Sequence, residues 1–195
     1  DLTYAQFEDF HRRYYHPANA RIFFYGDDEP QQRLLLLEEY LGEFGHASIN
    51  SAIDLQPRFV APKRLLRSYA VSPEDNGIEK SIVAVNWMLD GDVNPQLSMA
   101  LHILEHILIG TPASPLRMAL IESGLGEDLA GIGLEDELRQ FYFSTGLKGV
   151  EAKNVEAVEK LVLSTLEKVA VAGIDAGAIA AALNTTEFRL RENNT

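Results

Sequence analysis

Several residue types and patterns are missing from this sequence of 195 residues, and each absence excludes a class of protein or site. It contains no cysteine, which excludes disulfide frameworks, cysteine-based zinc and iron–sulfur sites, and thiol nucleophiles. Its longest largely apolar stretches, residues 81–89 and 101–110, reach only about half of the roughly 20 residues that a membrane-spanning helix needs. We therefore expect no membrane partner.

Positive charge is also scarce. Seventeen Lys and Arg residues stand against 29 Asp and Glu residues, which gives a formal net charge of -12. Such a surface repels phosphate backbones and anionic lipids unless its basic residues cluster, and no cluster occurs. The sequence therefore predicts that nucleic acid is not a partner, while 46% hydrophobic residues are typical of a folded protein with a core.

The amino-terminal part predicts a helix followed by a strand. Thr3 and Gln6 have the spacing of a capping box, and apolar residues then recur at helical spacing, so we expect a helix over residues 4–15. Residues 20–25 (ARIFFY) are aromatic and β-branched and predict a buried strand.

A second helix and a connector follow. Asp28 is suited to cap a helix that Pro30 begins. Residues 45–77 lose the periodicity and contain several prolines, so they predict an extended linker with one short strand at residues 65–71.

The remaining sequence mixes strands with helices. Residues 79–89 and 140–150 alternate as strands, and we expect both in one sheet. The acidic run 133–137 has the composition of a solvated loop. Helices are predicted to begin near Pro95, Pro115, Lys153 and Asp175. These elements indicate an α+β fold with a largely antiparallel sheet and helices packed on one face.

One motif has the residue types of a metal site. His102, Glu105 and His106 form the pattern H-x-x-E-H, in which two histidines four apart lie on one face of a helix and can share a Zn²⁺ ion. Glu105 would then be the general base that takes a proton from metal-bound water. A third ligand is still needed, and spacing does not choose among the candidate carboxylates Glu187, Glu192, Glu151 and Glu156. The alternative is a buried structural helix whose histidines are hydrogen-bonded and whose Glu105 is paired.

Several longer segments carry a family resemblance. They are residues 14–28 (YYHPANARIFFYGDD), 108–117 (LIGTPASPLR), 122–126 (ESGLG), 146–150 (GLKGV) and 184–194. Together they resemble the pitrilysin-like (inverzincin) zinc metallopeptidases, and the presequence protease branch in particular.

The resemblance implies a fragment of a much larger enzyme built from related, duplicated α+β domains. Residues 1–44 would end a first domain, residues 45–77 would be a linker, and residues 78–195 would form much of a second, non-catalytic domain. The working zinc of such enzymes lies in the first domain, so His102, Glu105 and His106 would belong to a degenerate copy. Glu187 falls where the distal ligand of that copy would lie.

Two functions of different class follow. In the first, the chain is part of a zinc metalloendopeptidase that degrades cleaved targeting peptides and other short unstructured peptides, and it forms mostly the chamber wall beside the remaining domains. In the second, it is a metal-free structural or interaction domain. The sequence alone does not assign a compartment. The resemblance implies an organelle interior, either the mitochondrial matrix or the chloroplast stroma.

Overall fold

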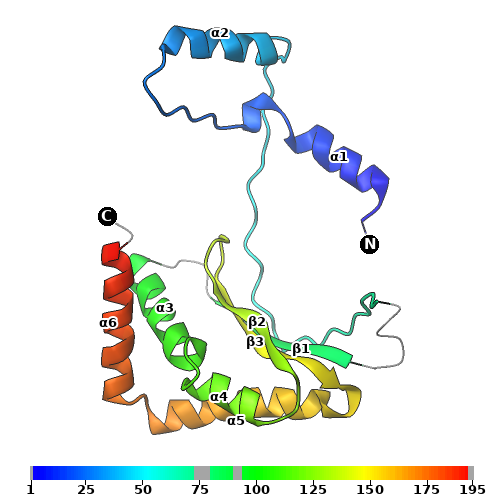
Figure 1. Cartoon of the computed structure of the whole chain (residues 1–195). Helices are drawn as coiled ribbons and strands as arrows, with labels where there is room; N and C mark the ends of the chain where they lie inside the picture. Colours follow the sequence, from blue (N-terminus) through cyan, green and yellow to red (C-terminus); the bar gives the residue numbers. More distant parts are fainter. Residues whose placement is uncertain (1, 73–79, 90–93, 193–195) are drawn as a thin grey trace. The chain divides into compact units, whose positions relative to one another are not determined.

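The computed structural model describes residues 2–72, 80–89 and 94–192. The chain divides into two compact units, Asp1–Asp54 and Leu55–Thr195, which are described separately below. Figure 1 labels the helices and strands of both units.

The first unit contains two helices and one short 3₁₀ turn. They are α1 (Tyr4–Tyr14), η1 (Pro17–Asn19) and α2 (Pro30–Leu41). The predicted capping box begins α1: the Gln6 backbone N–H donates to Thr3 Oγ1 at 3.3 Å, and the Thr3 backbone N–H donates to Gln6 Oε1 at 2.8 Å. The prediction of the first helix is thus confirmed.

Two local predictions for this unit are wrong. Residues 20–25 are extended but form no strand, because no strand partner lies beside them in the described residues. Asp28 does not cap α2, whose N-cap is Glu29. The Asp28 carboxylate instead accepts hydrogen bonds from the Arg33 guanidinium, which lowers the pKa of Asp28. A guanidinium offers a charged, two-pronged partner that a backbone N–H does not match.

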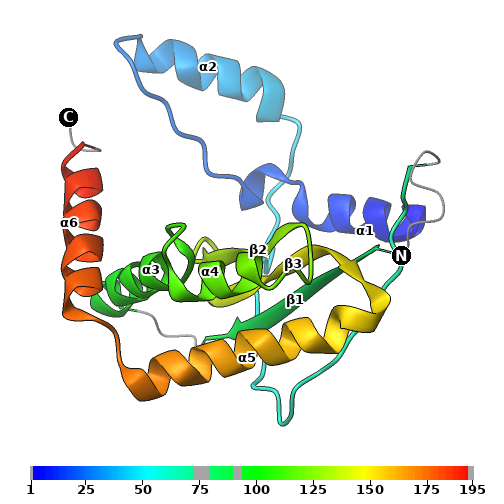
Figure 2. The same ribbon diagram turned by 60° about the horizontal axis from the view of Figure 1, so that its bottom comes forward.

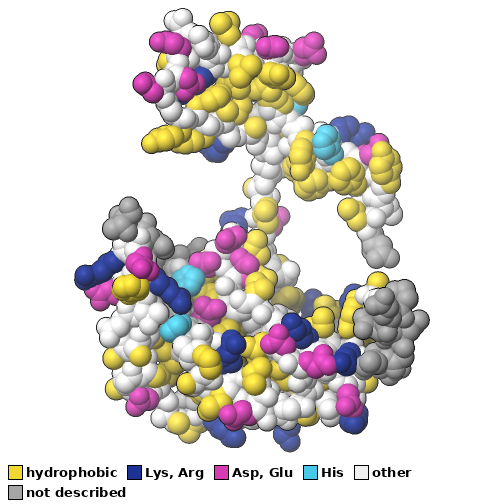
Figure 3. All heavy atoms as spheres, in the orientation of Figure 1, with side chains coloured by type: hydrophobic (Ala, Val, Ile, Leu, Met, Phe, Trp, Pro, Cys, Tyr) yellow, Lys and Arg dark blue, Asp and Glu magenta, His cyan; other side chains and the backbone are white. Residues whose placement is uncertain are grey.

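The first unit has no core of its own. None of its described residues is buried, and Phe23 and Tyr25 are 86% and 94% exposed. Figure 3 shows hydrophobic side chains spread over its visible surface. The unit therefore needs an apolar partner, because it buries too little surface to offset the entropy of ordering its backbone.

The second unit is built on a three-stranded antiparallel sheet. Its strands are β1 (Lys80–Met88), β2 (Asp128–Glu135) and β3 (Tyr142–Glu151), in the order β1-β3-β2. The prediction that the first and last of these share a sheet is confirmed. The strand β2 differs from the prediction, because it includes residues 133–135 of the acidic run expected to be a solvated loop. Its glycines, Gly131 and Gly133, break the alternation that identifies a strand.

The described residues of the second unit also form the helices α3 (Pro95–Ile109), α4 (Pro115–Glu122), α5 (Val155–Ala172) and α6 (Ala176–Glu192), with the 3₁₀ turn η3 (Ala152–Asn154) before α5 (Figure 2). The helix starts predicted near Pro95 and Asp175 are confirmed, and side chains cap both helices: Asn94 accepts the Leu97 N–H at 2.8 Å, and Asp175 accepts the Ala178 N–H at 3.0 Å. No described helix has the length and hydropathy that would let it cross a membrane.

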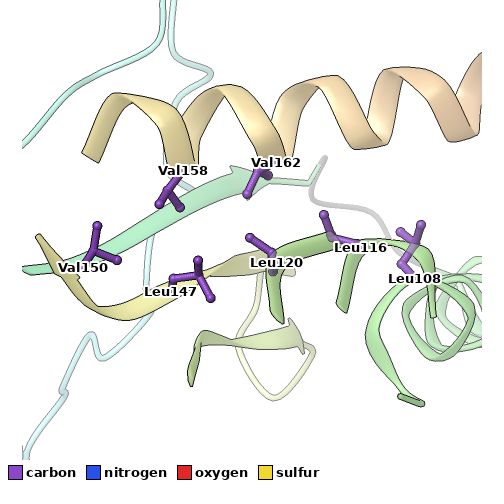
Figure 4. Close-up of a cluster of buried hydrophobic side chains, with 7 residues drawn as sticks. All are labelled: Leu108, Leu116, Leu120, Leu147, Val150, Val158 and Val162. Carbon is purple, nitrogen blue, oxygen red and sulfur yellow. The ribbon is translucent and has the colours of Figure 1, made fainter. Parts of the chain in front are cut away.

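The core lies between the sheet and the helices on one of its faces. Seven buried side chains from α3, α4, β3 and α5 form it, as Figure 4 shows: Leu108, Leu116, Leu120, Leu147, Val150, Val158 and Val162. Along β1, Val83, Val85 and Trp87 pack against this core, whereas Ile82 and Met88, on the other face, are 57% and 43% exposed. The α+β arrangement with helices on one face is thus confirmed.

The segment 55–72 contains no helix or strand and is held to the rest of the second unit by hydrogen bonds and an ion pair. Gln56 and Gln140 exchange hydrogen bonds, in which the Gln56 N–H donates to Gln140 Oε1 at 2.5 Å and Gln140 Nε2 donates to Gln56 O at 3.3 Å. Arg64 pairs with Glu159 of α5 at 2.5 Å. The short strand predicted at residues 65–71 is not formed, because the backbone of this segment makes no ladder with a strand of the described residues.

Candidate functional site

The H-x-x-E-H residues lie on α3, in the second unit. Asn94 and Pro95 begin this helix, and its i, i+3, i+4 geometry places His102, Glu105 and His106 along one side. The sequence therefore located the motif correctly on a helix. What each side chain contacts decides what the motif can do.

His102 contacts a carboxylate. Its Nε2 lies 2.8 Å from Oδ2 of Asp136, which follows β2 directly. The two side chains are 40% and 37% exposed, so the pair sits at the edge of the core rather than inside it. The Nε2 atom of His102 is therefore hydrogen-bonded to a carboxylate in this arrangement.

Glu105 contacts the backbone of β2. Its Oε1 accepts the Leu134 N–H at 3.3 Å. Gly133, beside it, has φ +78, and a Cβ at that position would collide with Glu105 Oε1. The close approach of α3 to β2 thus depends on a glycine at position 133.

His106 lies in the last turn of α3, where a buried hydroxyl caps the helix. Ser114, 3% exposed, donates from Oγ to His106 O at 3.2 Å and accepts the Thr111 N–H at 3.0 Å. Ser114 is the N-cap residue of α4 but makes no side-chain cap bond to that helix, because its hydroxyl is used by α3. The turn between α3 and α4 is therefore fixed by hydrogen bonds around the end of the motif.

The candidate third ligands lie on other elements. Glu187, on α6, pairs with Arg191 one turn later, although α6 does pack against α3. Glu151, at the end of β3, pairs with Lys153 at 2.5 Å, which lowers the pKa of Glu151. Glu156 is at the start of α5, and Glu192 is the last residue of α6.

Within residues 2–72, 80–89 and 94–192, no group of three or more His, Asp or Glu side chains is placed to hold a metal ion. His102 and Glu105 instead connect α3 to β2, and we call these two contacts, His102–Asp136 and Glu105–Leu134, the α3 brace. In this arrangement the residues do not fit a zinc site. Zinc binding by His102, His106 and Glu187, with Glu105 as base, stays a prediction that a metal assay must test.

Sequence reasoning did not identify Asp136, Gly133 or Ser114 as parts of this region. An acidic run and a glycine in β2 were the available signals, but neither indicates contact with a helix nearly 30 residues earlier. Such contacts depend on the strand order, which spacing along the chain does not contain.

Comparison with known proteins indicates the family to which this chain is related. Residues 1–186 match the Peptidase M16 inactive domain. The whole chain aligns at 50% identity with presequence protease 1, chloroplastic/mitochondrial, of Arabidopsis thaliana, and covers 18% of that protein. It also aligns in full at 32% identity with protein HypA of Clostridium perfringens, of which it covers 20%, and at 33% identity with the mitochondrial presequence protease of Mus musculus, of which it covers 19%. The chain thus spans about a fifth of the length of these relatives.

Proposed function

Because this chain belongs to the peptidase M16 family, through that family's inactive domain, we propose that it is a non-catalytic wall segment of a longer zinc metalloendopeptidase. The longer enzyme degrades cleaved targeting peptides and other short unstructured peptides. Its zinc is held outside these residues, and the other domains of the same enzyme are the partners of this segment.

The α3 brace is the observation that carries the non-catalytic role. A catalytic zinc needs three convergent protein ligands and a base free to reach its water. Here His102 faces Asp136, and the Glu105 carboxylate accepts a backbone N–H. The motif therefore serves to hold a helix against a strand.

The substrate class and the compartment are supported by relatives and by charge. Two of the three relatives described above are named presequence proteases, one chloroplastic/mitochondrial and one mitochondrial. A net charge of -12 favours basic peptides over acidic ones. We infer an organelle interior, the mitochondrial matrix or the chloroplast stroma, as the place of action.

Zinc content and peptidase activity test this function together. The 195-residue chain should retain no stoichiometric zinc after dialysis. In the longer enzyme, Glu105→Gln should leave both the zinc content and the cleavage of an unstructured basic peptide near those of the control Glu122→Gln, which changes an exposed carboxylate on α4. One equivalent of zinc on the 195-residue chain, lost in His106→Ala, would overturn the non-catalytic role. A longer enzyme without peptidase activity would instead favour a purely structural or interaction domain.

A further inference from the structure

The segment 55–72 belongs to the second unit, but none of its residues is buried. Its apolar side chains are exposed as well, and Val60 and Leu66 reach 104% and 92% exposure. Buried apolar surface is the main force that keeps a segment of chain in one position. Because this segment buries no side chain, its position depends on its polar contacts.

Among the described residues, two polar contacts hold the first part of this segment, residues 55–68. Gln140 bonds both backbone groups of Gln56, as described above. Arg64 makes a two-pronged contact with Glu159 of α5, in which Nε donates to Oε2 at 3.3 Å and Nη2 donates to Oε1 at 2.5 Å. Opposite charges in this geometry make the second contact the stronger of the two.

The contact between Arg64 and Glu159 is nevertheless weak, because it is open to water. The two side chains are 81% and 33% exposed. An ion pair in such surroundings shifts an equilibrium by only about 2- to 5-fold, and dissolved salt screens it further. A groove of about 600 Å³ also lies between Arg64 and α5, so the ion pair rather than packed side chains connects the two. On α5 the groove is lined by Glu156, Glu159, Lys160, Leu163, Ser164 and Glu167.

We propose that residues 55–68 are a strap, which closes on α5 through the ion pair of Arg64 with Glu159 and is released when salt screens that pair. The closed and released forms differ by two exposed polar contacts and by no buried apolar side chain. Both forms are therefore populated under native conditions, and their ratio responds to a modest change in ionic strength.

Release of the strap changes the length of the connector between the two units. In the first unit Ser51 Oγ donates to Asn19 Oδ1 at 2.7 Å, and in the second unit Tyr69 Oη donates to Lys80 O at 2.8 Å. The free connector therefore comprises residues 52–55 when the strap is closed and residues 52–68 when both of its contacts are broken. At about 3.5 Å per residue, the longest span of the connector grows from about 18 Å to about 60 Å.

Single-molecule fluorescence energy transfer in the 195-residue chain tests this proposal. The chain has no cysteine, so Ala61→Cys in the strap and Ala170→Cys on α5, both at exposed positions, provide two specific labelling sites. Two populations are expected at low salt. Their ratio, closed to released, should fall about 2- to 5-fold as the salt concentration rises from about 0.05 M to about 1 M. The fluorescence of Trp87 in the unlabelled chain should stay constant and report that the sheet is folded.

Matched variants separate the ion pair from the general charge of α5. Glu159→Gln should populate the released form at low salt and remove the salt response. Glu167→Gln removes the same charge from the same helix and should leave both unchanged. Exchanging the charges, with Arg64→Glu and Glu159→Arg together, should restore the salt response. Gln140→Ala should favour the released form but keep the salt response, because the amide contact carries no net charge.

Three results would contradict the proposal. A single population at every salt concentration would show that the segment is either permanently bound or permanently free. An effect of Glu167→Gln as large as that of Glu159→Gln would assign the response to the general charge of α5. A charge exchange that fails to restore the response would show that Arg64 and Glu159 do not act as a pair. The readout uses neither zinc nor catalysis, so its outcome is independent of the proposed function.

Discussion

Replacing Gly133 by alanine tests how tightly α3 is held against β2. Gly133 has φ +78, and an added Cβ would meet the Glu105 carboxylate and lie 3.1 Å from Ile109 Cδ1. Two costs are therefore expected: backbone strain, and displacement of Glu105 from the Leu134 N–H.

The two costs differ in size, and only the second one, the lost hydrogen bond, depends on Glu105. An alanine in the left-handed region costs about 1–2 kcal/mol. Displacing the Glu105 carboxylate loses one hydrogen bond, which contributes about 1 kcal/mol. Gly133→Ala should thus lower the free energy of unfolding by about 2–3 kcal/mol in the native background, and by about 1–2 kcal/mol in a Glu105→Ala background.

The assay is urea unfolding followed by the fluorescence of Trp87, the one tryptophan of the chain, which packs near Phe143 in the second unit. Four proteins complete the double-mutant cycle: the native chain, each single variant and the double variant. A coupling of about 1 kcal/mol supports the α3 brace. Strictly additive effects would show that the hydrogen bond between Glu105 and the Leu134 N–H does not depend on the glycine at position 133. That result would refute the α3 brace.

Three further outcomes are expected. Leu116→Ala, at a fully buried position, should lower the free energy of unfolding by about 2–5 kcal/mol, whereas Met118→Ala, at a side chain 43% exposed, should change it far less in the same urea assay. Thr3→Ala should destabilise the start of α1 by about 1 kcal/mol, seen as faster amide exchange at Gln6, and Thr3→Ser should not. Lys148 lies 2.9 Å from Asp128 and lowers its pKa, so the contribution of this pair is present above the ordinary carboxyl pKa and is lost as the pH falls through the lowered one. An NMR titration should show that pKa rising in Lys148→Gln, and an unchanged value would contradict the assignment.

Elements whose signals are local could be predicted from the sequence. The capping box at Thr3, the cap at Asn94 and the cap at Asp175 each depend on residues within three positions, and all three form. The strand predicted at residues 20–25 requires a distant partner that the described residues do not contain. β2 was missed for the opposite reason, because its pairing with β3 overrides a glycine-rich sequence.

The candidate site likewise has one part that local spacing predicts and another part that depends on tertiary structure. The i, i+4 spacing correctly placed His102 and His106 on one helix. Nothing in that spacing indicates that Asp136 faces His102 or that Leu134 faces Glu105, because both contacts form only when β2 pairs with β3. Whether a histidine faces a metal or a carboxylate is decided by tertiary structure.

The contacts that hold the segment 55–72 to the rest of the second unit also constrain the order of folding. Gln56 meets Gln140 across 84 positions of sequence, and Arg64 meets Glu159 across 95. Closing loops of that length costs chain entropy that one amide pair or one exposed ion pair cannot offset alone. The sheet and α5 must therefore form first and bring these ends together. The segment should order last during folding and detach first during unfolding, before Trp87 reports any change.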